Sequence, residues 1–294
     1  MERFILHGGR PLSGKVRPAG NKNAALPMLA AALLTDEPVV LHNLPDIEDV
    51  RIMLQLLEGL GVDAVRRGRT VRLQAGAVRT RRLDPALCRR VRSSILLAGP
   101  LAARHGRAEL PPPGGDVIGR RRLDTHIRGL EGLGIRAETA SAAGLRFVRG
   151  RMRGAEILLD EASVTATENL LMAACLAPGR TTLFNAACEP HVQDLCGMLR
   201  KMGARIEGLG TNRLLVRGVR ALGGVEHRIG PDHVEIGSFL AAAAATGGSI
   251  TISPCGPKEP LEVMSRAFNK LGVAWTRRGR ELRLEEGGAR RVRN

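Results

Sequence analysis

A unit of roughly 70 residues occurs four times along this 294-residue chain, and this repeat constrains the fold more than any other feature of the sequence. Each copy begins with an apolar helix rich in Ala and Leu, continues through a short strand into an amphipathic helix, and ends in a two-stranded hairpin. A glycine follows each amphipathic helix, where a residue with positive φ is expected to end it. These glycines are Gly61, Gly134, Gly203 and Gly272.

The amphipathic helices carry apolar residues at helical spacing, which predicts one buried face on each. In the first copy, Arg51, Gln55 and Glu58 lie opposite that face. The residues predicted to face the core are Val50, Met53, Leu57 and Leu60 in the first copy, Leu123, Ile127, Leu130 and Leu133 in the second, Val192, Leu195, Leu199 and Met202 in the third, and Leu261, Met264, Phe268 and Leu271 in the fourth.

The order of elements predicts an α/β fold of repeated βαβαββ units, in which each copy takes its leading strand from the chain before it. A period this long favours a closed domain over a solenoid. Three copies, residues 21–229, would fill one domain. The fourth copy would belong to a second domain formed by residues 1–20 and 230–294, to which the segment at 3–9 is expected to add a strand.

Composition excludes several classes of protein. The chain has no apolar run long enough to cross a membrane, and its N-terminus lacks the pattern of a signal peptide, so neither is expected. Its five cysteines form no C-x-x-C pair and are expected to be small buried side chains in a reducing cytoplasm. Its seven histidines show no metal-binding spacing, so no metal site is predicted.

The net charge of +16 indicates an anionic partner. Nucleic acid is disfavoured, because proteins that bind single strands stack the bases on aromatic side chains and only 2% of this chain is aromatic. The arginines are spread over all four copies, so most are expected to be solvated. A minority would line a site for a small anionic substrate.

The starts of the Ala/Leu-rich helices are the first candidate site. Lys22 and Asn23 begin the helix of the first copy, and Arg92 holds the equivalent position in the second. Backbone N–H groups at a helix start, together with a cation, bind phosphate or carboxylate groups, although an Asn there is more often only a cap. Ser163 and Asp232 hold the corresponding positions in the third and fourth copies. Because equivalent helix ends converge in a symmetric domain, Lys22 and Arg92 are expected to lie close together.

The second candidate is the Pro- and Gly-rich connection at residues 111–126 of the second copy. Extended connections of this kind often act as lids over a site. Asp116 lies at its tip and is followed by Arg120, Arg121 and Arg122. The alternative is a solvated carboxylate beside basic neighbours.

Several of these motifs together resemble one family. They are GNKNAALP, VRSS before an apolar helix, PGGDVIG followed by LDTH, SVTATEN, NAACEPHVQDL and PDHVEIGSFL, and they run in order along the whole chain. The family is the UDP-N-acetylglucosamine 1-carboxyvinyltransferases, or enolpyruvyl transferases. The resemblance implies an inside-out α/β barrel with two domains of three repeats each. It also implies transfer of an enolpyruvyl group from phosphoenolpyruvate to the sugar 3-hydroxyl, which releases phosphate in the first committed step of peptidoglycan synthesis and uses no cofactor.

The resemblance assigns roles to residues by position. Lys22 would contact the phosphate of phosphoenolpyruvate, and Asn23 would bind the sugar diphosphate or the tetrahedral intermediate. Two arginines would add positive charge around the phosphates, four residues would surround the uridine, and one glutamate would lie near the cleft. The two arginines are Arg92 and Arg121, and the glutamate is Glu189. The residues around the uridine are Asp124, His126, Ser163 and Val164.

Asp116 occupies the lid position at which most members of the family have cysteine. The residue at this position is taken to donate a proton to the C3 methylene of phosphoenolpyruvate or to assist product release. Because the antibiotic fosfomycin alkylates the cysteine, the resemblance predicts that a form with aspartate is insensitive to it.

The chain also departs from the family pattern. Glu161 and Ala162 stand where lysine is common, Thr165 replaces a glycine, Arg122 replaces a proline, and His233 replaces an arginine. The family continues past this segment into the catalytic base and further phosphoenolpyruvate-binding arginines. We therefore expect the second domain to hold one repeat of three, with Phe239, Leu240, Leu261 and Met264 lacking partners, and we expect little turnover unless a separate chain supplies the remaining repeats.

Two alternatives of other kinds stay open. The chain could be a non-catalytic UDP-sugar-binding remnant or a regulatory paralogue, a reading that Glu161 and His233 favour. It could also be an RNA-processing enzyme built on related repeats, which would predict salt-sensitive RNA binding.

Overall fold

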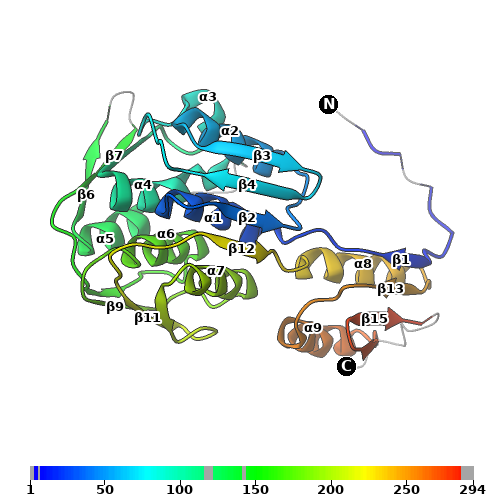
Figure 1. Cartoon of the computed structure of the whole chain (residues 1–294). Helices are drawn as coiled ribbons and strands as arrows, with labels where there is room; N and C mark the ends of the chain where they lie inside the picture. Colours follow the sequence, from blue (N-terminus) through cyan, green and yellow to red (C-terminus); the bar gives the residue numbers. More distant parts are fainter. Residues whose placement is uncertain (1–2, 6, 116–121, 141–143, 286–294) are drawn as a thin grey trace. The chain divides into compact units, whose positions relative to one another are not determined.

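The computed structural model describes residues 3–5, 7–115, 122–140 and 144–285, and it divides into two compact units. The large unit is Lys22–Ile229, and the small unit combines Met1–Asn21 with Gly230–Asn294 (Figure 1). Each unit has its own apolar core. That these units are one complete domain of three repeats and one partial domain stays a prediction.

The centre of the large unit consists of helices that are buried along most of their length. These are α1 (Lys22–Ala31), continued by the 3-10 helix η1 (Ala32–Leu34); α4 (Ala98–His105), preceded by the 3-10 helix η2 (Arg92–Leu97); and α6 (Val164–Ala174). All residues of α1 from Ala24 to Ala31 are buried, as are those of α6 from Ala166 to Ala174. A helix without a polar face is stable only inside a core, so the Ala/Leu-rich segments form the interior of the unit (Figure 1).

The amphipathic helices pack against this centre. They are α2 (Glu48–Leu60), α5 (Asp124–Gly132) and α7 (Pro190–Lys201), and a short helix, α3 (Pro85–Cys88), precedes η2. In α2 the predicted face from Val50 to Leu60 is buried, whereas Arg51 and Glu58 are exposed. The four predicted helix-ending glycines all have positive φ, between 74° and 103°, which confirms how these helices end.

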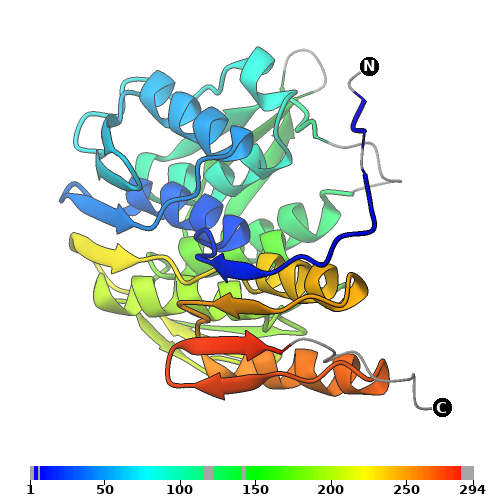
Figure 2. The same cartoon turned by 90° about the vertical axis from the view of Figure 1, so that its right-hand side faces the viewer.

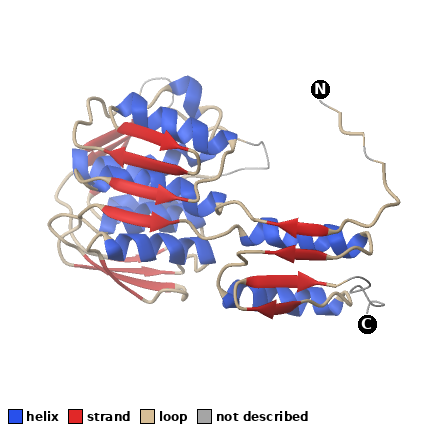
Figure 3. Ribbon diagram, turned by 45° about the vertical axis from the view of Figure 1, so that its right-hand side comes forward, coloured by secondary structure: helices blue, strands red, loops and turns tan. Residues whose placement is uncertain are grey.

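Three small sheets surround the helices of the large unit (Figure 3). In two of them, a strand that precedes one apolar helix pairs in parallel with a strand that follows an apolar helix: β12 (Val225–Arg228) lies beside β2 (Val39–His42), and β8 (Glu156–Leu158) lies beside β9 (Arg180–Phe184). Because β12 is the last strand of the unit and β2 the first, this pair closes the unit on itself. The sheets are β12-β2-β4-β3 (Val225–Arg228, Val39–His42, Thr70–Gln74, Asp63–Arg67), β5-β7-β6 (Arg107–Leu110, Leu145–Arg149, Ile135–Thr139) and β10-β11-β9-β8 (Arg205–Glu207, Arg213–Arg217, Arg180–Phe184, Glu156–Leu158).

The small unit has one sheet with α8 (His233–Ala245) and α9 (Lys258–Lys270) packed against it (Figure 2). Its strand order is β1-β13-β15-β14, and β1 is parallel to β13. The bounds of these strands are Gly14–Val16, Ile250–Ile252, Glu281–Leu284 and Thr276–Arg278.

Three expectations for the small unit are corrected. The described residues of segment 3–9 form no strand, and Phe4 and Ile5 are 89% and 82% exposed; the strand starts later, at Gly14, where β13 offers a partner. Leu240 and Leu261, predicted to lack partners, are buried in the unit's own core, against which Phe239 and Met264 pack. Leu271, predicted to face the core, is instead 56% exposed.

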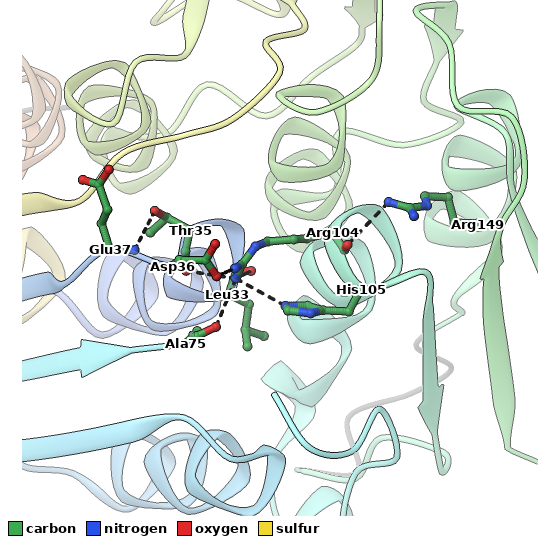
Figure 4. A network of polar contacts seen from close by, with 8 residues as sticks. All are labelled: Leu33, Thr35, Asp36, Glu37, Ala75, Arg104, His105 and Arg149. Carbon is green, nitrogen blue, oxygen red and sulfur yellow. Dashed lines mark hydrogen bonds and ion pairs between the residues drawn. The ribbon is translucent and has the colours of Figure 1, made fainter. Parts of the chain in front are cut away.

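Arg104 joins the first two copies inside the large unit (Figure 4). Its guanidinium donates to the carbonyl oxygens of Leu33 and Thr35, each at 2.9 Å, and of Ala75 at 3.2 Å, and it forms an ion pair with Asp36. These carbonyls lie at the end of η1 and just after β4, so one side chain satisfies backbone groups that no helix or strand uses there. Burial lowers the pKa of the neighbouring His105 to about 4, and the charge of Arg104 adds to this effect.

Within the described part of the chain, no helix has both the length and the apolar character required to cross a membrane.

Candidate active site

Two adjacent cavities open at the N-terminal end of α6 in the large unit. The α5–α6 pocket has a volume of about 540 Å³, and the α1–α6 pocket has a volume of about 290 Å³. They share Arg92, Val164 and Thr165, so one helix end and one arginine border both spaces.

The α1–α6 pocket brings Lys22 and Arg92 together, as the repeat predicts. Lys22 is the first residue of α1, and Arg92 is the first residue of η2. The ammonium of Lys22 lies 3.2 Å from a carboxylate oxygen of Asp49, which comes from the first turn of α2. Asn23 lines the same space. Helix N-termini carry partial positive charge, so this pocket combines two cations with the kind of backbone group that binds anions.

The α5–α6 pocket contains the residues assigned to the nucleotide. Asp124 and His126 reach it from the first turn of α5, and Ser163 and Val164 reach it from the start of α6. Ser163 is the N-cap of α6, and its hydroxyl accepts from the N–H of Ala166 at 3.4 Å. The N–H groups of the residues that follow a cap have no partner within their own helix, so they can receive an anionic ligand.

Charges of both signs border the α5–α6 pocket. Arg128 pairs with Asp160 at 2.7 Å, and Arg122 forms an ion pair with Asp124. Glu161, the predicted charge reversal, also lines this pocket. A diphosphate would therefore meet cations at Arg92 and Arg122 but a carboxylate at Glu161.

His126 is buried at the back of this pocket and is neutral at physiological pH. Its pKa falls to about 4, first because burial disfavours the imidazolium and second because Arg92 is close. The ring contacts Asn169 through Nδ1 at 3.1 Å and Thr165 through Nε2 at 3.2 Å. His126 therefore bridges the core and the first turn of α6.

Glu168 is a candidate residue that the sequence analysis missed. Its side chain lines the α1–α6 pocket, is only 1% exposed, and among the described residues has no hydrogen-bond partner for Oε1. Burial raises its pKa well above the ordinary value, and the charge of Glu189 adds to the rise. The one available signal was that this glutamate is the single charged residue of a buried helix, because a carboxyl is rarely buried without a function.

Glu189, predicted to lie near the cleft, precedes α7 as its N-cap and is exposed. It is not among the described residues that line either pocket, and it acts on the site through the pKa of Glu168. Asp116 and Arg121 lie outside the described residues, as does Arg120.

The segment that leads to Asp116 is held against the start of η2. The N–H of Gly114 donates to the carbonyl of Cys88 at 2.9 Å, and Gly115, with φ of 92°, lines the α1–α6 pocket. A Cβ on Gly114 would lie 1.7 Å from the carbonyl oxygen of Arg89. Only glycine therefore permits this approach.

Gly114→Ala is expected to lower the free energy of unfolding by about 1–3 kcal/mol, because the added methyl group meets backbone that cannot move aside. Gly197→Ala is the matched control, since nothing lies within 4 Å of a Cβ at this position in α7. Ala is the better helix former, so the control is expected to be neutral or to stabilise by about 0.5–1 kcal/mol. Urea unfolding followed by circular dichroism measures both, and equal stability of the two variants would contradict the close approach.

The fold and the two pockets define a class: a repeated α/β protein with cation-lined pockets at the N-termini of its inner helices. The family model for EPSP synthase (3-phosphoshikimate 1-carboxyvinyltransferase) matches residues 6–292. The chain therefore belongs to the carboxyvinyltransferase, or enolpyruvyl transferase, family.

Individual relatives narrow the comparison. The chain is 52% identical over 289 residues to a UDP-N-acetylglucosamine 1-carboxyvinyltransferase from Treponema denticola, a match that covers 97% of this chain and 67% of the relative. It is 49% identical over 281 residues to the protein of the same name from Bradyrhizobium diazoefficiens, covering 95% and 64%. The chain thus spans about two thirds of the length of these relatives.

Solved structures support the fold. The enolpyruvyl transferase NikO from Streptomyces tendae superposes with a TM-score of 0.83 at 23% identity, covering 95% of this chain and 67% of that one. EPSP synthase from Acinetobacter baumannii superposes with a TM-score of 0.74 at 19% identity. The predicted α/β architecture of this transferase fold is confirmed.

Proposed function

We propose that the large unit binds UDP-N-acetylglucosamine and phosphoenolpyruvate, and that the protein transfers the enolpyruvyl group to the 3-hydroxyl of the sugar. The observation that carries this proposal is that Lys22 and Arg92 line the same cavity, the α1–α6 pocket. Arg92 and the start of α6 also line the larger α5–α6 pocket beside it. Two anionic reactants can then occupy neighbouring spaces under a common positive field. The name of the relatives, UDP-N-acetylglucosamine 1-carboxyvinyltransferase, supports the sugar nucleotide as the acceptor.

The larger, α5–α6 pocket suits the nucleotide. Asp124 and His126 would hold the uridine from α5, and Ser163 and Val164 would hold it and the diphosphate from α6. The neutral state of His126 fits this role, because a neutral imidazole can both donate and accept a hydrogen bond. The N–H groups at the start of α6 would face the diphosphate.

The α1–α6 pocket suits phosphoenolpyruvate. Lys22 would bind its phosphate, with Arg92 beside it and Asn23 toward the sugar or the tetrahedral intermediate. The sugar hydroxyl would add to C2 while a proton goes to C3, and loss of phosphate together with a C3 proton would restore the double bond. Cations already in position would offset the repulsion between the reactants and stabilise the leaving phosphate.

Asp116 and Arg121 keep their proposed roles, proton transfer at C3 for Asp116 and phosphate binding for Arg121. Because an aspartate offers no thiol to alkylate, we propose that an active form is insensitive to fosfomycin.

Isothermal titration with UDP-N-acetylglucosamine tests the proposal directly. We expect a Kd in the micromolar range for the 294-residue polypeptide. Phosphate release from phosphoenolpyruvate is expected near background for this polypeptide alone, because it spans about two thirds of the length of these relatives. Fusion to the remaining third of the Treponema denticola relative is expected to raise it.

The results separate this function from the binding-only alternative, which the carboxylate of Glu161 in the α5–α6 pocket favours. Binding without turnover in the fusion would support a non-catalytic UDP-sugar-binding protein. Strong turnover by the 294-residue polypeptide would contradict the need for the further segment. Absence of binding would overturn the assignment of the pockets.

A further inference from the structure

Thr165, like Val164, lies at the start of α6 and lines both pockets. Whether the hydroxyl serves as a donor or as an acceptor depends on the hydrogen bonds behind it. These bonds can be followed from the core outward.

The orientation of Asn169 is set by two backbone groups. The N–H of Gly99 donates to Oδ1 at 2.7 Å, and Nδ2 donates to the carbonyl oxygen of Ile95 at 2.9 Å. Turning the amide over would place a donor against a donor and an acceptor against an acceptor. Asn169 is fully buried, so this arrangement has no water to relax it. The second hydrogen on Nδ2 therefore points to Nδ1 of His126, 3.1 Å away.

This contact selects one tautomer of His126. Nδ1 must accept the hydrogen bond from Asn169, so the single ring proton of the neutral imidazole lies on Nε2. Burial and the charge of Arg92 keep the ring neutral by lowering its pKa to about 4. Nε2 then donates to the hydroxyl oxygen of Thr165 at 3.2 Å.

Thr165 thus receives a hydrogen bond from the core side and retains its own hydrogen. Among the described residues, the hydrogen bond found for this hydroxyl is the one from His126. We propose that the hydroxyl of Thr165 donates a hydrogen bond to an anionic phosphate oxygen of a nucleoside diphosphate sugar lying across both pockets. The donor direction is imposed by Asn169 through His126. This inference rests on the proposed function and adds to it a residue that recognises the diphosphate.

The surroundings show why such a donor matters here. Glu161 lines the α5–α6 pocket and would repel a diphosphate. A hydroxyl whose hydrogen faces the ligand compensates in part, because hydrogen bonds to charged acceptors are the stronger ones. Arg92, which also borders both pockets, supplies charge at the same place.

A matched pair of variants tests the proposal. Thr165→Val keeps the shape but removes the hydroxyl, and Thr165→Ser keeps the hydroxyl. Titration of UDP-N-acetylglucosamine is expected to show affinity about tenfold or more weaker for T165V, and within about threefold of the wild type for T165S. Because T165V also leaves the N–H of His126 without an acceptor, thermal unfolding and the His126 signals confirm that the variant is folded.

A second measurement does not depend on the ligand. Nitrogen-15 NMR of the imidazole ring distinguishes the two neutral tautomers, and protonated Nε2 with unprotonated Nδ1 is expected for His126. The opposite tautomer would overturn the proposal, because Thr165 would then have to donate to the ring. The proposal would also be overturned if T165V bound UDP-N-acetylglucosamine as tightly as the wild type, or if T165V and T165S lost the same affinity for it.

Pyrophosphate serves as a second probe, and it separates the proposed function from the proposed role of the Thr165 hydroxyl. If the wild type binds pyrophosphate but not the UDP-sugar, the proposed function fails, and the same T165V and T165S comparison made with pyrophosphate decides the role of the hydroxyl. If the wild type binds neither, both claims are wrong.

Discussion

Glu168→Gln is expected to stabilise the protein against unfolding by an amount that grows as the pH rises. Burial, with a contribution from Glu189, holds the pKa of Glu168 well above its ordinary value of 4.5, which the unfolded chain regains. The stability that the neutral carboxyl contributes is fully present below pH 4.5 and is lost as the pH rises toward the raised pKa. The loss is up to about 1.4 kcal/mol per pH unit in that window. Glutamine stays neutral and has no such loss.

Urea unfolding at intervals from pH 4 to pH 8, followed by far-UV circular dichroism, measures the difference between Glu168→Gln and the wild type. The only tryptophan, Trp275, lies in the small unit, so its fluorescence reports that unit separately. A difference that does not change with pH would contradict a neutral buried carboxyl.

Two variants control this experiment. Glu189→Gln removes a charge that raises the pKa of Glu168. It is therefore expected to narrow the pH range over which the free energy of unfolding falls. Glu58→Gln removes a carboxylate from the exposed face of α2 and is expected to change the free energy of unfolding by less than about 0.5 kcal/mol. A pH-dependent gain in Glu58→Gln as large as that in Glu168→Gln would assign the effect to net charge.

Much of the large unit could be predicted from the repeat because the relevant signals are local. Helical spacing marks the buried face of α2, and a glycine with positive φ ends each amphipathic helix. The meeting of Lys22 and Arg92 was also predictable, since equivalent helix starts converge when repeated units close on one another. That inference needed only the alignment of the copies.

Other features depend on contacts that no local pattern contains. Glu168 lies on a helix that is buried on all sides from Ala166 onward, and periodicity does not say that one of its positions lines a pocket. The path from Asn169 through His126 to Thr165 joins side chains of α5 and α6. Segment 3–9 has an apolar start suited to a strand, but β13 pairs with Gly14–Val16 instead. Each of these features depends on contacts between distant parts of the chain.

Arg92→Ala is expected to weaken binding of UDP-N-acetylglucosamine by about 100-fold. Hydrogen bonds to charged groups contribute about 1.5–3 kcal/mol, and this guanidinium borders both pockets, so its loss affects the diphosphate from two sides. The same variant is expected to raise the pKa of His126 from about 4, because the positive charge of Arg92 helps to hold it down. Calorimetry measures the first effect, and NMR titration of the imidazole measures the second.

Arg72→Ala provides the control for Arg92→Ala, since Arg72 is exposed on β4 and its removal lowers the net charge by the same amount. If long-range attraction by the net charge of +16 governed binding, the two variants would lose similar affinity and both losses would vanish in high salt. If Arg92 acts by direct contact, Arg72→Ala stays within about twofold of the wild type, because exposed charges farther away than a Debye length are screened. If Arg92→Ala raised the pKa of His126 but kept its affinity for UDP-N-acetylglucosamine, Arg92 would lie beside the ring without contacting the ligand. The assignment of the diphosphate to this part of the site would then be wrong.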